Sequence, residues 1–300
     1  MSSGFKIGVD GGGTKTECVL LDASGAIVAR HLAPASNPNV VGPEQARHIV
    51  TAALEALRAV TPAGTPPPVL THLYMAGSRS FWLDVARLLT GCGEVAVFHD
   101  ALPVLELATH GQPGLVLHAG TGSFVAARAP DGSTHYAGGL GWRFGDPGSG
   151  YDLGRRAIAC ALLELQGWAP VSRLTAAVRA ATPLGETADP AAITRYFYQH
   201  AEPNREIAGL SPAVLRLAGE GEAVAHQIVI ESTAGLLTLA TQVMGKLFPG
   251  VGPEALRAGL SGPILTHPVV TRAFAATSHL PLVPVEGSPV DGIRRLLRRA

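Results

Sequence analysis

The sequence predicts an α/β protein made of two related domains, and three observations lead to this prediction. With 300 residues, the chain is longer than a usual single domain. Short apolar strand patterns alternate with helical patterns, which is typical of a sheet covered by helices. A three-stranded meander with a glycine-rich corner occurs twice along the chain.

The first meander begins near the N-terminus. Its strands are expected at residues 5–10, 16–21 and 26–31. The segment Gly11-Gly12-Gly13-Thr14 separates the first two strands, and a turn at residues 22–25 separates the second from the third. A helix is expected at residues 44–60, where apolar side chains recur at helical spacing.

The second meander repeats this pattern, with strands expected at residues 115–118, 123–128 and 133–137. Three residue pairs are separated by 107 positions: Gly13 and Gly120, Thr14 and Thr121, and Gly25 and Gly132. A single repeat of this length indicates duplicated domains, because solenoid repeats recur every ~20–50 residues. Coincidence between two glycine-rich hairpins is the alternative, and the three matched positions favour duplication.

The remaining elements complete the α/β pattern. Strands are expected at residues 69–75, 94–99, 256–260 and 280–285, and helices at residues 81–89, 102–109, 155–165, 190–200, 222–244 and 293–299. We expect an N-terminal domain at residues 1–113 and a C-terminal domain with a helical insertion at residues 114–300. The terminal helix is expected to pack back on the N-terminal domain, with its four arginines on a solvated face.

Composition excludes several classes of protein. Apolar residues make up 47% and charged residues 15%, which is the reverse of a disordered chain. Lys and Arg total 23 and Asp and Glu total 23, without the basic excess of a nucleic-acid-binding protein. Cys18, Cys92 and Cys160 are widely spaced, which argues against a disulfide framework or a thiolate metal site. Without a leader pattern or an apolar run near ~18 residues, we expect a cytoplasmic protein with no membrane or nucleic-acid partner.

The two glycine corners predict a nucleotide site. A backbone without Cβ atoms can approach an anion closely and adopt positive φ, and successive N–H groups can cradle a phosphate. The candidate residues are Gly12, Gly13, Thr14 and Lys15 in the first corner and Gly120, Thr121 and Gly122 in the second. Glycine corners also serve as plain tight turns, but a duplicated pair, each with a threonine, favours a nucleoside triphosphate held in an interdomain cleft. A strand rather than a helix follows each corner, which excludes a P-loop or a dinucleotide-binding motif.

Two aspartates are candidates for phosphoryl transfer, which needs Mg²⁺ and a carboxylate that takes the proton of the acceptor. Asp10 ends the first strand beside the glycine corner and is the candidate for orienting Mg²⁺, directly or through water. Asp100 follows the strand at residues 94–99, and ligands gather at the carboxyl ends of such strands. Asp100 is therefore the candidate general base, and its alternative role is the N-cap of the following helix.

These motifs resemble those of the N-acetylglucosamine kinase and BadF/BadG/BcrA/BcrD ATPase family, a branch of the sugar kinase–Hsp70–actin superfamily. The matching segments are Gly8-Val9-Asp10-Gly11-Gly12-Gly13-Thr14-Lys15-Thr16, Ser36-Asn37-Pro38-Asn39, His99-Asp100-Ala101, Gly120-Thr121-Gly122-Ser123, residues 138–154 and Gly259-Leu260-Ser261-Gly262-Pro263. They run in the order of the family from about residue 5 to about residue 292. The resemblance implies two ribonuclease-H-like, actin-like ATPase domains facing an interdomain cleft that holds ATP and Mg²⁺.

The resemblance also implies an activity, the ATP-dependent phosphorylation of the 6-hydroxyl of N-acetylglucosamine or glucosamine. Asp100 would be the general base. The sugar-binding residues would be Asn37, Ser123 and Asp146. Thr14 and Thr121 would contact phosphates, and Gly262 would pack on adenosine. Family members are often dimers, so the resemblance leaves a homodimer open.

The sequence departs from the family pattern around Asp146. The family usually reads GGWGxxxGDEGSxYW, whereas this chain has Leu140, Pro147 and Asp152 at the first Trp, the Glu and the second Trp. Because proline fixes φ and removes a backbone donor, we expect an altered loop around the sugar and an altered acceptor preference.

Three alternative functions stay open at this point. An ATPase activator of a dehydratase would need two cysteines near the glycine loops for an iron–sulfur cluster, and none of the three cysteines is expected there. A kinase for another hexose derivative, such as N-acetylmuramic acid, would use the same catalytic residues. A non-catalytic sugar sensor is disfavoured because Asp10, Thr14 and Asp100 are all retained.

Overall fold

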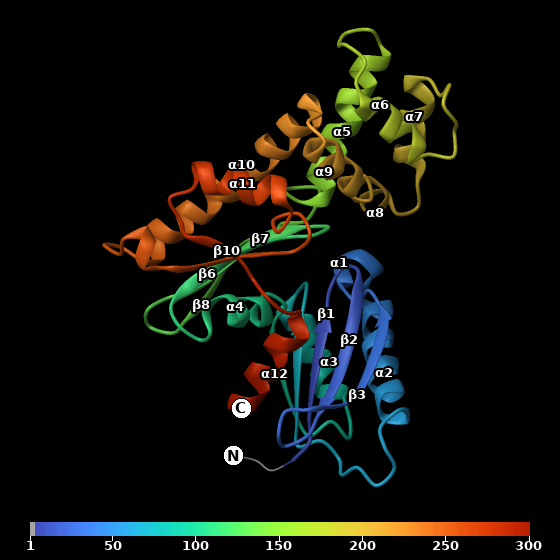
Figure 1. Ribbon diagram of the computed structural model, residues 1–300. Coiled ribbons are helices and arrows are strands. Elements are labelled where there is room, and N and C mark those ends of the chain that lie inside the picture. The colour runs from blue at the N-terminus through green and yellow to red at the C-terminus, as the bar shows by residue number, and fades with distance from the viewer. Residues whose placement is uncertain (1–3) are drawn as a thin grey trace. The chain divides into compact units, whose positions relative to one another are not determined.

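The computed structural model describes residues 4–300, which form two compact α/β units (Figure 1). The first unit comprises the chain up to His110 together with Glu286–Ala300, and the second comprises Gly111–Val285. Each unit contains a five-stranded sheet. The strand orders are β3-β2-β1-β4-β5 and, read from the other edge, β8-β7-β6-β9-β10, so the two sheets share one topology. The predicted α/β fold with a duplicated meander is confirmed.

The sheet of the first unit is mixed, with three antiparallel strands on one side and parallel strands on the other. The strands are β1 (Lys6–Gly11), β2 (Lys15–Leu21), β3 (Ile27–Pro34), β4 (Leu70–Met75) and β5 (Glu94–His99). β1, β2 and β3 are antiparallel neighbours, and β4 and β5 run parallel to β1. Gly11, Met75 and His99 lie in one row across the three parallel strands. Asp10 and Asp100, which flank this row in the sequence, therefore come to the same edge of the sheet.

Helices cover both faces of the first sheet. They are α1 (Pro38–Val41), α2 (Pro43–Ala59), α3 (Arg79–Leu88), α4 (Leu102–Thr109) and α12 (Pro289–Arg299). Cys18 and Leu20 of β2 belong to the core cluster that includes Leu54 of α2, whereas Val19 belongs to the cluster with Ile293 of α12. Alternate residues of β2 thus point to opposite faces, and both faces are buried.

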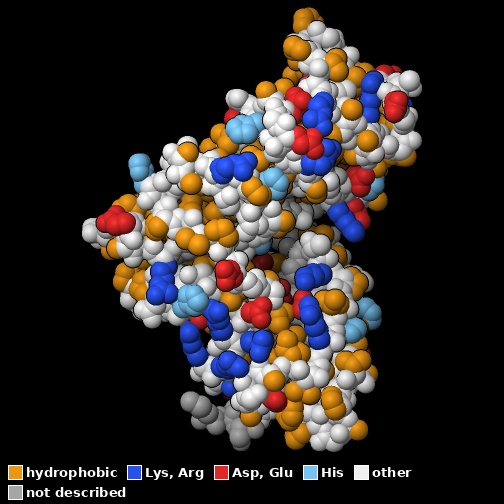
Figure 2. Space-filling view, viewed as in Figure 1, with side chains coloured by type: hydrophobic (Ala, Val, Ile, Leu, Met, Phe, Trp, Pro, Cys, Tyr) orange, Lys and Arg blue, Asp and Glu red, His pale blue; other side chains and the backbone are white. Residues whose placement is uncertain are grey.

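The arginines of α12 bind other parts of the first unit. Arg294 Nε donates to the carbonyl of Gly25 at 3.1 Å, and Arg298 donates to the carbonyl of Ser24 at 2.9 Å. Arg299 forms a 2.9 Å ion pair with Glu106, which is fully buried on α4. Figure 2 shows basic side chains gathered where Figure 1 places α12. Arg298 and Arg299 are exposed, as expected of a solvated face, and these contacts in addition fasten α12 to the unit.

The second unit has the same sheet with a larger set of helices. Its strands are β6 (Gly114–Ala119), β7 (Ser123–Arg128), β8 (Thr134–Gly138), β9 (Arg257–Ser261) and β10 (Leu282–Pro284). Its helices are α5 (Gly150–Leu165), α6 (Arg173–Ala180), α7 (Pro190–Gln199), α8 (Pro203–Ala208), α9 (Ser211–Gly219), α10 (Ala223–Leu247) and α11 (Pro268–Thr277), with a 3₁₀ turn at Pro253–Ala255. Leu115 and Leu117 of β6 form its core with Leu153 of α5 and Leu236 of α10. The helices α1, α6, α8, α9 and α11 were not predicted from the sequence.

Within residues 4–300, α10 is the one helix long and apolar enough, by length and composition, to cross a membrane. Its Ala225, Ile228 and Leu236 are buried in the core of the second unit. α10 also contacts α5, α9 and β7 of the same unit. α10 is therefore placed as a core helix of the second unit, and core helices can be as long and apolar as membrane-spanning ones.

Candidate active site

The glycine corner of the first unit is a tight hairpin turn tied to a neighbouring loop. The amide of Gly12 donates to the carbonyl of Lys15 at 3.0 Å, which leaves Gly13 and Thr14 at the tip. The amides of Ser36 and Asn37 donate to the carbonyl of Gly12 at 3.1 and 3.2 Å. The corner and the Ser36–Asn37 segment therefore form one fixed structure.

The glycines of both corners provide space rather than unusual backbone angles. None of Gly11, Gly12, Gly13, Gly120 and Gly122 adopts the left-handed φ that the sequence analysis allowed for. A Cβ on Gly13 would meet no atom within 4 Å, and a Cβ on Gly12 would come no closer than 3.8 Å to Lys15 O. The backbone of this tip is therefore open to an approaching anion.

Asp10 lies beside this corner in an environment that disfavours its negative charge. Burial raises the pKa of Asp10 to about 7, the nearby charge of Asp100 raises it further, and Lys15 acts in the opposite direction. Two close carboxylates of this kind suit a divalent cation, which would compensate both charges. Residues 4–300 contain no cluster of three or more His, Cys, Asp or Glu side chains able to hold a metal. One or two carboxylates fit Mg²⁺, which keeps several waters and binds phosphate oxygens as well.

Asp100 is not the N-cap of the following helix. The N-cap of α4 is Ala101, and no side chain caps the helix. Oδ1 of Asp100 lies 2.7 Å from Nδ1 of His99. The cap alternative is therefore wrong, and the carboxylate of Asp100 stays at the edge of the sheet where Asp10 also lies. The contact of Asp100 with His99 was not predicted from the sequence.

The side chains of Asn37 and Lys15 each make a hydrogen bond within the first unit. Asn37 is the N-cap of α1, and its Oδ1 accepts from the amide of Asn39 at 3.0 Å. Among residues 4–300 the side-chain NH₂ of Asn37 has no hydrogen-bond acceptor, so it can donate to a ligand. Lys15 Nζ donates to Glu17 Oε2 at 2.7 Å. Glu17 is buried and also pairs with Arg30, and a carboxylate inside an apolar strand was the sequence signal that could have revealed it.

The corner of the second unit is anchored by the N-terminus of α5. The amide of Gly120 donates to the carbonyl of Gly122 at 2.9 Å, and the amides of Gly150 and Tyr151 donate to the carbonyls of Gly120 and Thr121 at 2.7 and 3.4 Å. Thr14 and Thr121 occupy matching exposed tips of the two corners. Each predicted phosphate corner is thus held rigid by amides from the segment that follows its meander.

Asp146 lies directly against this second corner. A Cβ on Gly122 would come within 2.8 Å of Asp146 Oδ2, so a side chain there would displace the carboxylate. Asp146 is buried, with φ of 62°, and its Oδ1 accepts from the amide of Gly141 at 3.3 Å. Burial raises the pKa of Asp146. The structure therefore brings two predicted site residues, Gly122 and Asp146, into contact.

Ser123 faces the loop that carries Asp146. Its hydroxyl donates to the carbonyl of Pro147 at 2.7 Å, and its side chain is buried. A Cβ on Gly235 of α10 would lie 2.9 Å from Pro147 Cβ, so this glycine makes room for the proline ring. Pro147, one of the departures from the family pattern, is therefore fitted to its surroundings.

The same loop exposes apolar side chains. Leu140 is 64% exposed and Phe144 is 83% exposed. Arg143 stacks over the ring of Trp142, with its Cζ 4.8 Å from the ring centroid. An acceptor that reached this loop would meet apolar surface and one cation.

Gly262 lies next to the end of β6, close to the second corner. It has φ of 88°, and a Cβ there would lie 2.2 Å from Ala119 O. His118, which precedes Ala119, contacts Ser261 Oγ through Nδ1 at 3.1 Å. The predicted adenosine motif and the predicted phosphate corner are therefore adjacent within the second unit.

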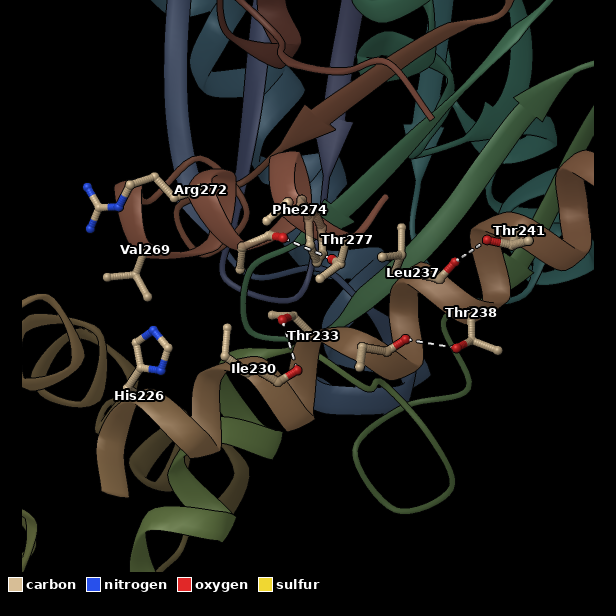
Figure 3. Close-up of a pocket in the computed structure, with 13 residues that line it drawn as sticks. His226, Ile230, Thr233, Leu237, Thr238, Thr241, Val269, Arg272, Phe274 and Thr277 are labelled. Atoms are coloured by element: carbon tan, nitrogen blue, oxygen red, sulfur yellow. Dashed lines mark hydrogen bonds between the residues drawn. The ribbon is translucent and has the colours of Figure 1, made fainter. Parts of the chain in front are cut away.

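A separate groove with a cavity volume of about 590 Å³ lies between α10 and α11 (Figure 3). The hydroxyls of the four threonines that line it donate to backbone carbonyls of their own helices: Thr233, Thr238, Thr241 and Thr277. The groove surface is therefore more apolar than its composition suggests. None of the candidate active-site residues, all of which the structure describes, lines this groove.

Comparison with known proteins identifies the family. The BadF/BadG/BcrA/BcrD ATPase family matches residues 7–248, and the chain belongs to this family. An N-acetyl-D-glucosamine kinase from Dictyostelium discoideum is 26% identical over 263 residues, which cover 82% of this chain and 81% of the relative. An N-acetylmuramic acid/N-acetylglucosamine kinase from Clostridium acetobutylicum is 26% identical over 243 residues, which cover 77% and 76%.

Solved structures share the fold. A candidate N-acetylglucosamine kinase from Chromobacterium violaceum matches with a TM-score of 0.78 at 27% identity, covering 99% of this chain and 100% of that chain. A ROK-family glucokinase from Streptomyces griseus, solved with glucose and AMPPNP, matches with a TM-score of 0.59 at 13% identity over 99% of both chains. At that identity the glucokinase shows the fold alone.

Proposed function

We propose that the chain is an ATP-dependent kinase that phosphorylates the 6-hydroxyl of an amino sugar, N-acetylglucosamine or glucosamine. Membership of an ATPase family and the kinases named among its relatives support phosphoryl transfer to a sugar. The observation that carries the proposal is the pair of carboxylates, Asp10 and Asp100, beside the open corner of the first unit. We expect a small-molecule acceptor in the cytoplasm and no nucleic-acid or membrane partner.

In this reaction Asp100 accepts the proton of the 6-hydroxyl while the sugar oxygen attacks the terminal phosphorus and ADP leaves. Asp10 would hold Mg²⁺, and a bound Mg²⁺ would neutralise charge on the phosphate oxygens. Asn37 donates from its side-chain NH₂ to a sugar hydroxyl, and Asp146 accepts from another.

We expect the glycine corners and the predicted adenosine motif to bind the nucleotide. The open backbone of the first corner and the hydroxyls of Thr14 and Thr121 bind phosphate oxygens. Lys15 adds a positive charge that it shares with Glu17. Gly262 lets the backbone pack closely against adenosine.

A substrate panel with a base variant tests the proposal. ADP release is measured with ATP, Mg²⁺ and glucosamine, N-acetylglucosamine, N-acetylmuramic acid, glucose or N-acetylmannosamine. Release that depends on an amino sugar supports the proposal, and a flat response across all five acceptors contradicts it and would fit a sugar sensor. Asp100→Asn is expected to lower kcat by ~10²-fold or more while nucleotide affinity stays within about twofold. Equal turnover by this variant would remove Asp100 from the mechanism.

N-acetylmuramic acid is a second candidate acceptor. This sugar carries a carboxylate, and Arg143 is an exposed cation on the loop of Asp146. Among residues 4–300 no carboxylate pairs with Arg143. The relative from Clostridium acetobutylicum is named for both sugars. If Arg143 recognises this carboxylate, Arg143→Gln lowers kcat/KM for N-acetylmuramic acid about tenfold and leaves that for N-acetylglucosamine within about twofold.

The dehydratase-activator alternative finds no support in the cysteines. Cys18 and Cys92 are buried in the core of the first unit, and Cys160 lies on α5 of the second. Neither unit presents a pair of thiols beside its glycine corner, within the described part of the chain.

A further inference from the structure

The loop that carries Asp146 is held by a relay that begins at Asp152, where the family pattern has tryptophan. Asp152 lies in the first turn of α5 and is only 7% exposed. Its Oδ2 accepts from the hydroxyl of Ser232 on α10 at 2.6 Å. The Ser232 oxygen in turn accepts from the amide of Gly148 at 3.2 Å. A buried carboxylate is thus connected through one hydroxyl to the backbone of the loop.

Two arginines complete the surroundings of Asp152. Arg155 donates to Oδ1 at 2.9 Å, and Arg156 donates to Oδ2 at 3.1 Å. Burial alone would raise the pKa of Asp152, but Ser232 and the two arginines outweigh it, so the pKa lies below its ordinary value. The carboxylate therefore stays ionised, and the Ser232 hydroxyl keeps its hydrogen directed at Asp152. This orientation leaves a Ser232 lone pair for the amide of Gly148.

The loop needs this support because Asp146 has a left-handed backbone conformation. A φ of 62° is unfavourable for a residue with a Cβ and persists only where the surroundings fix it. Two neighbouring hydrogen bonds help to fix it. The hydroxyl of Ser123 donates to the carbonyl of Pro147 at 2.7 Å, and the amide of Ser149 donates to the carbonyl of Asp146 at 3.2 Å. The Gly148 amide adds the third point of attachment, and it is the one that α10 provides.

We propose that Asp152 is a positioning residue for the sugar acceptor, holding Asp146 in place through Ser232 and the amide of Gly148. This inference rests on the proposed function, because it takes Asp146 as a ligand of the acceptor. The departure at position 152 then replaces the bulk of a tryptophan with a charged anchor for the loop.

A purely structural role for Asp152 would act through the stability of α5. The amide of Asp152 donates to Oγ of Ser149, the N-cap, and a carboxylate in the first turn interacts favourably with the helix dipole. A test must therefore separate the position of the loop from the stability of the unit. Asp189 offers a matched control, because it caps α7 of the same unit by accepting from the amide of Ala192 at 2.7 Å.

The experiment uses the full chain with Asp152→Ala, Ser232→Ala, Asp152→Asn and the control Asp189→Ala. Ser232→Ala breaks the relay while Asp152 keeps its arginines, so it stays informative if Asp152→Ala fails to fold. Asp152→Asn keeps an acceptor for Ser232 and tests the charge alone. The readouts are kcat, KM for acceptor and for ATP, and amide hydrogen exchange over residues 146–149.

We expect Asp152→Ala and Ser232→Ala to raise the acceptor KM about tenfold or more, with KM for ATP within about twofold. Exchange at the Gly148 amide should be faster by a similar factor, and Asp152→Asn should lie between these variants and the native chain. The proposal is overturned if acceptor KM and Gly148 exchange are unchanged in both alanine variants, or change as much in Asp189→Ala. If the native chain phosphorylates no sugar, the proposed function fails and the exchange alone decides: faster exchange in Ser232→Ala supports the relay, and unchanged exchange overturns it.

Discussion

Replacing Asp10 with asparagine should stabilise the protein in the absence of ligands above pH 7. Burial raises the pKa of Asp10 from an ordinary value of 3.8 to about 7, and the charge of Asp100 raises it as well. In the unfolded chain the same group titrates near 3.8, so folding at pH 8 places a negative charge where the structure disfavours it. Asparagine keeps the shape of the side chain and removes this charge.

The sign and size of the effect follow from the two pKa values. Below pH 3.8 both states bind the proton and the cost is absent. Between pH 3.8 and about 7 only the folded state keeps the proton, so the free energy of unfolding falls as the pH rises. Above about 7 the cost is complete, and at ~1.4 kcal/mol per pH unit it amounts to at most about 4 kcal/mol. At pH 5 the same arithmetic leaves about 1.5 kcal/mol.

The assay is denaturant and thermal unfolding of both proteins at pH 5 and pH 8, without nucleotide or divalent cation. Asp10→Asn should exceed the native chain in stability at pH 8 and approach it at pH 5. Asp84→Asn is the matched control, because Asp84 is exposed on α3 of the same unit and pairs with Arg87. Mg²⁺ with ATP should stabilise the native chain and not the Asp10 variant. Equal or lower stability of Asp10→Asn at pH 8 would refute the reasoning.

Three further predictions concern the second unit. Gly122→Ala should raise the acceptor KM about tenfold or more, because its Cβ would lie 2.8 Å from Asp146 Oδ2; steady-state kinetics check this, and an unchanged KM would contradict the contact. Gly262→Ala should lower the free energy of unfolding by about 2 kcal/mol or more and weaken ATP binding, because φ is 88° and the new Cβ would lie 2.2 Å from Ala119 O. Thermal unfolding and calorimetry check this. The control is Gly245→Ala, whose Cβ would meet nothing within 4 Å. The pKa of Asp152 is lowered in the folded state, so its stabilising contribution is present above pH 3.8 and is lost as the pH falls further. The melting temperatures of the native chain and Asp152→Asn should therefore converge between pH 6 and pH 3, and a constant difference would count against the ionised network.

The duplicated sheet could be predicted because its signals are local and repeated. Strand length, glycine corner and turn recur at an offset of 107 residues, and the two sheets share one strand order. The edge that gathers Asp10 and Asp100 follows from parallel strands ending together, which needs only the order of elements. The same reasoning could not decide whether Asp100 caps α4, because a shift of one residue in the start of the helix changes which residue is the N-cap.

Contacts between segments far apart in the sequence could not be predicted from the sequence alone. Ser232 and Asp152 are separated by 80 positions, and neither residue alone suggests a relay to a loop. The contacts of Arg294 and Arg298 with the carbonyls of residues 25 and 24 were not predicted, because no charge pattern can indicate a backbone partner. Sequence patterns report propensity and periodicity, whereas these contacts depend on how the elements pack.

Two of the departures from the family pattern around Asp146, Pro147 and Asp152, each have partners that fit them. Pro147 loses a backbone donor, yet its ring fits beside Gly235 and its carbonyl accepts from Ser123. Asp152 would be a costly buried charge alone, but Ser232 and two arginines satisfy it. These fitted contacts are compatible with the proposed acceptor site, and the exposed apolar side chains of Leu140 and Phe144 lie on the same loop.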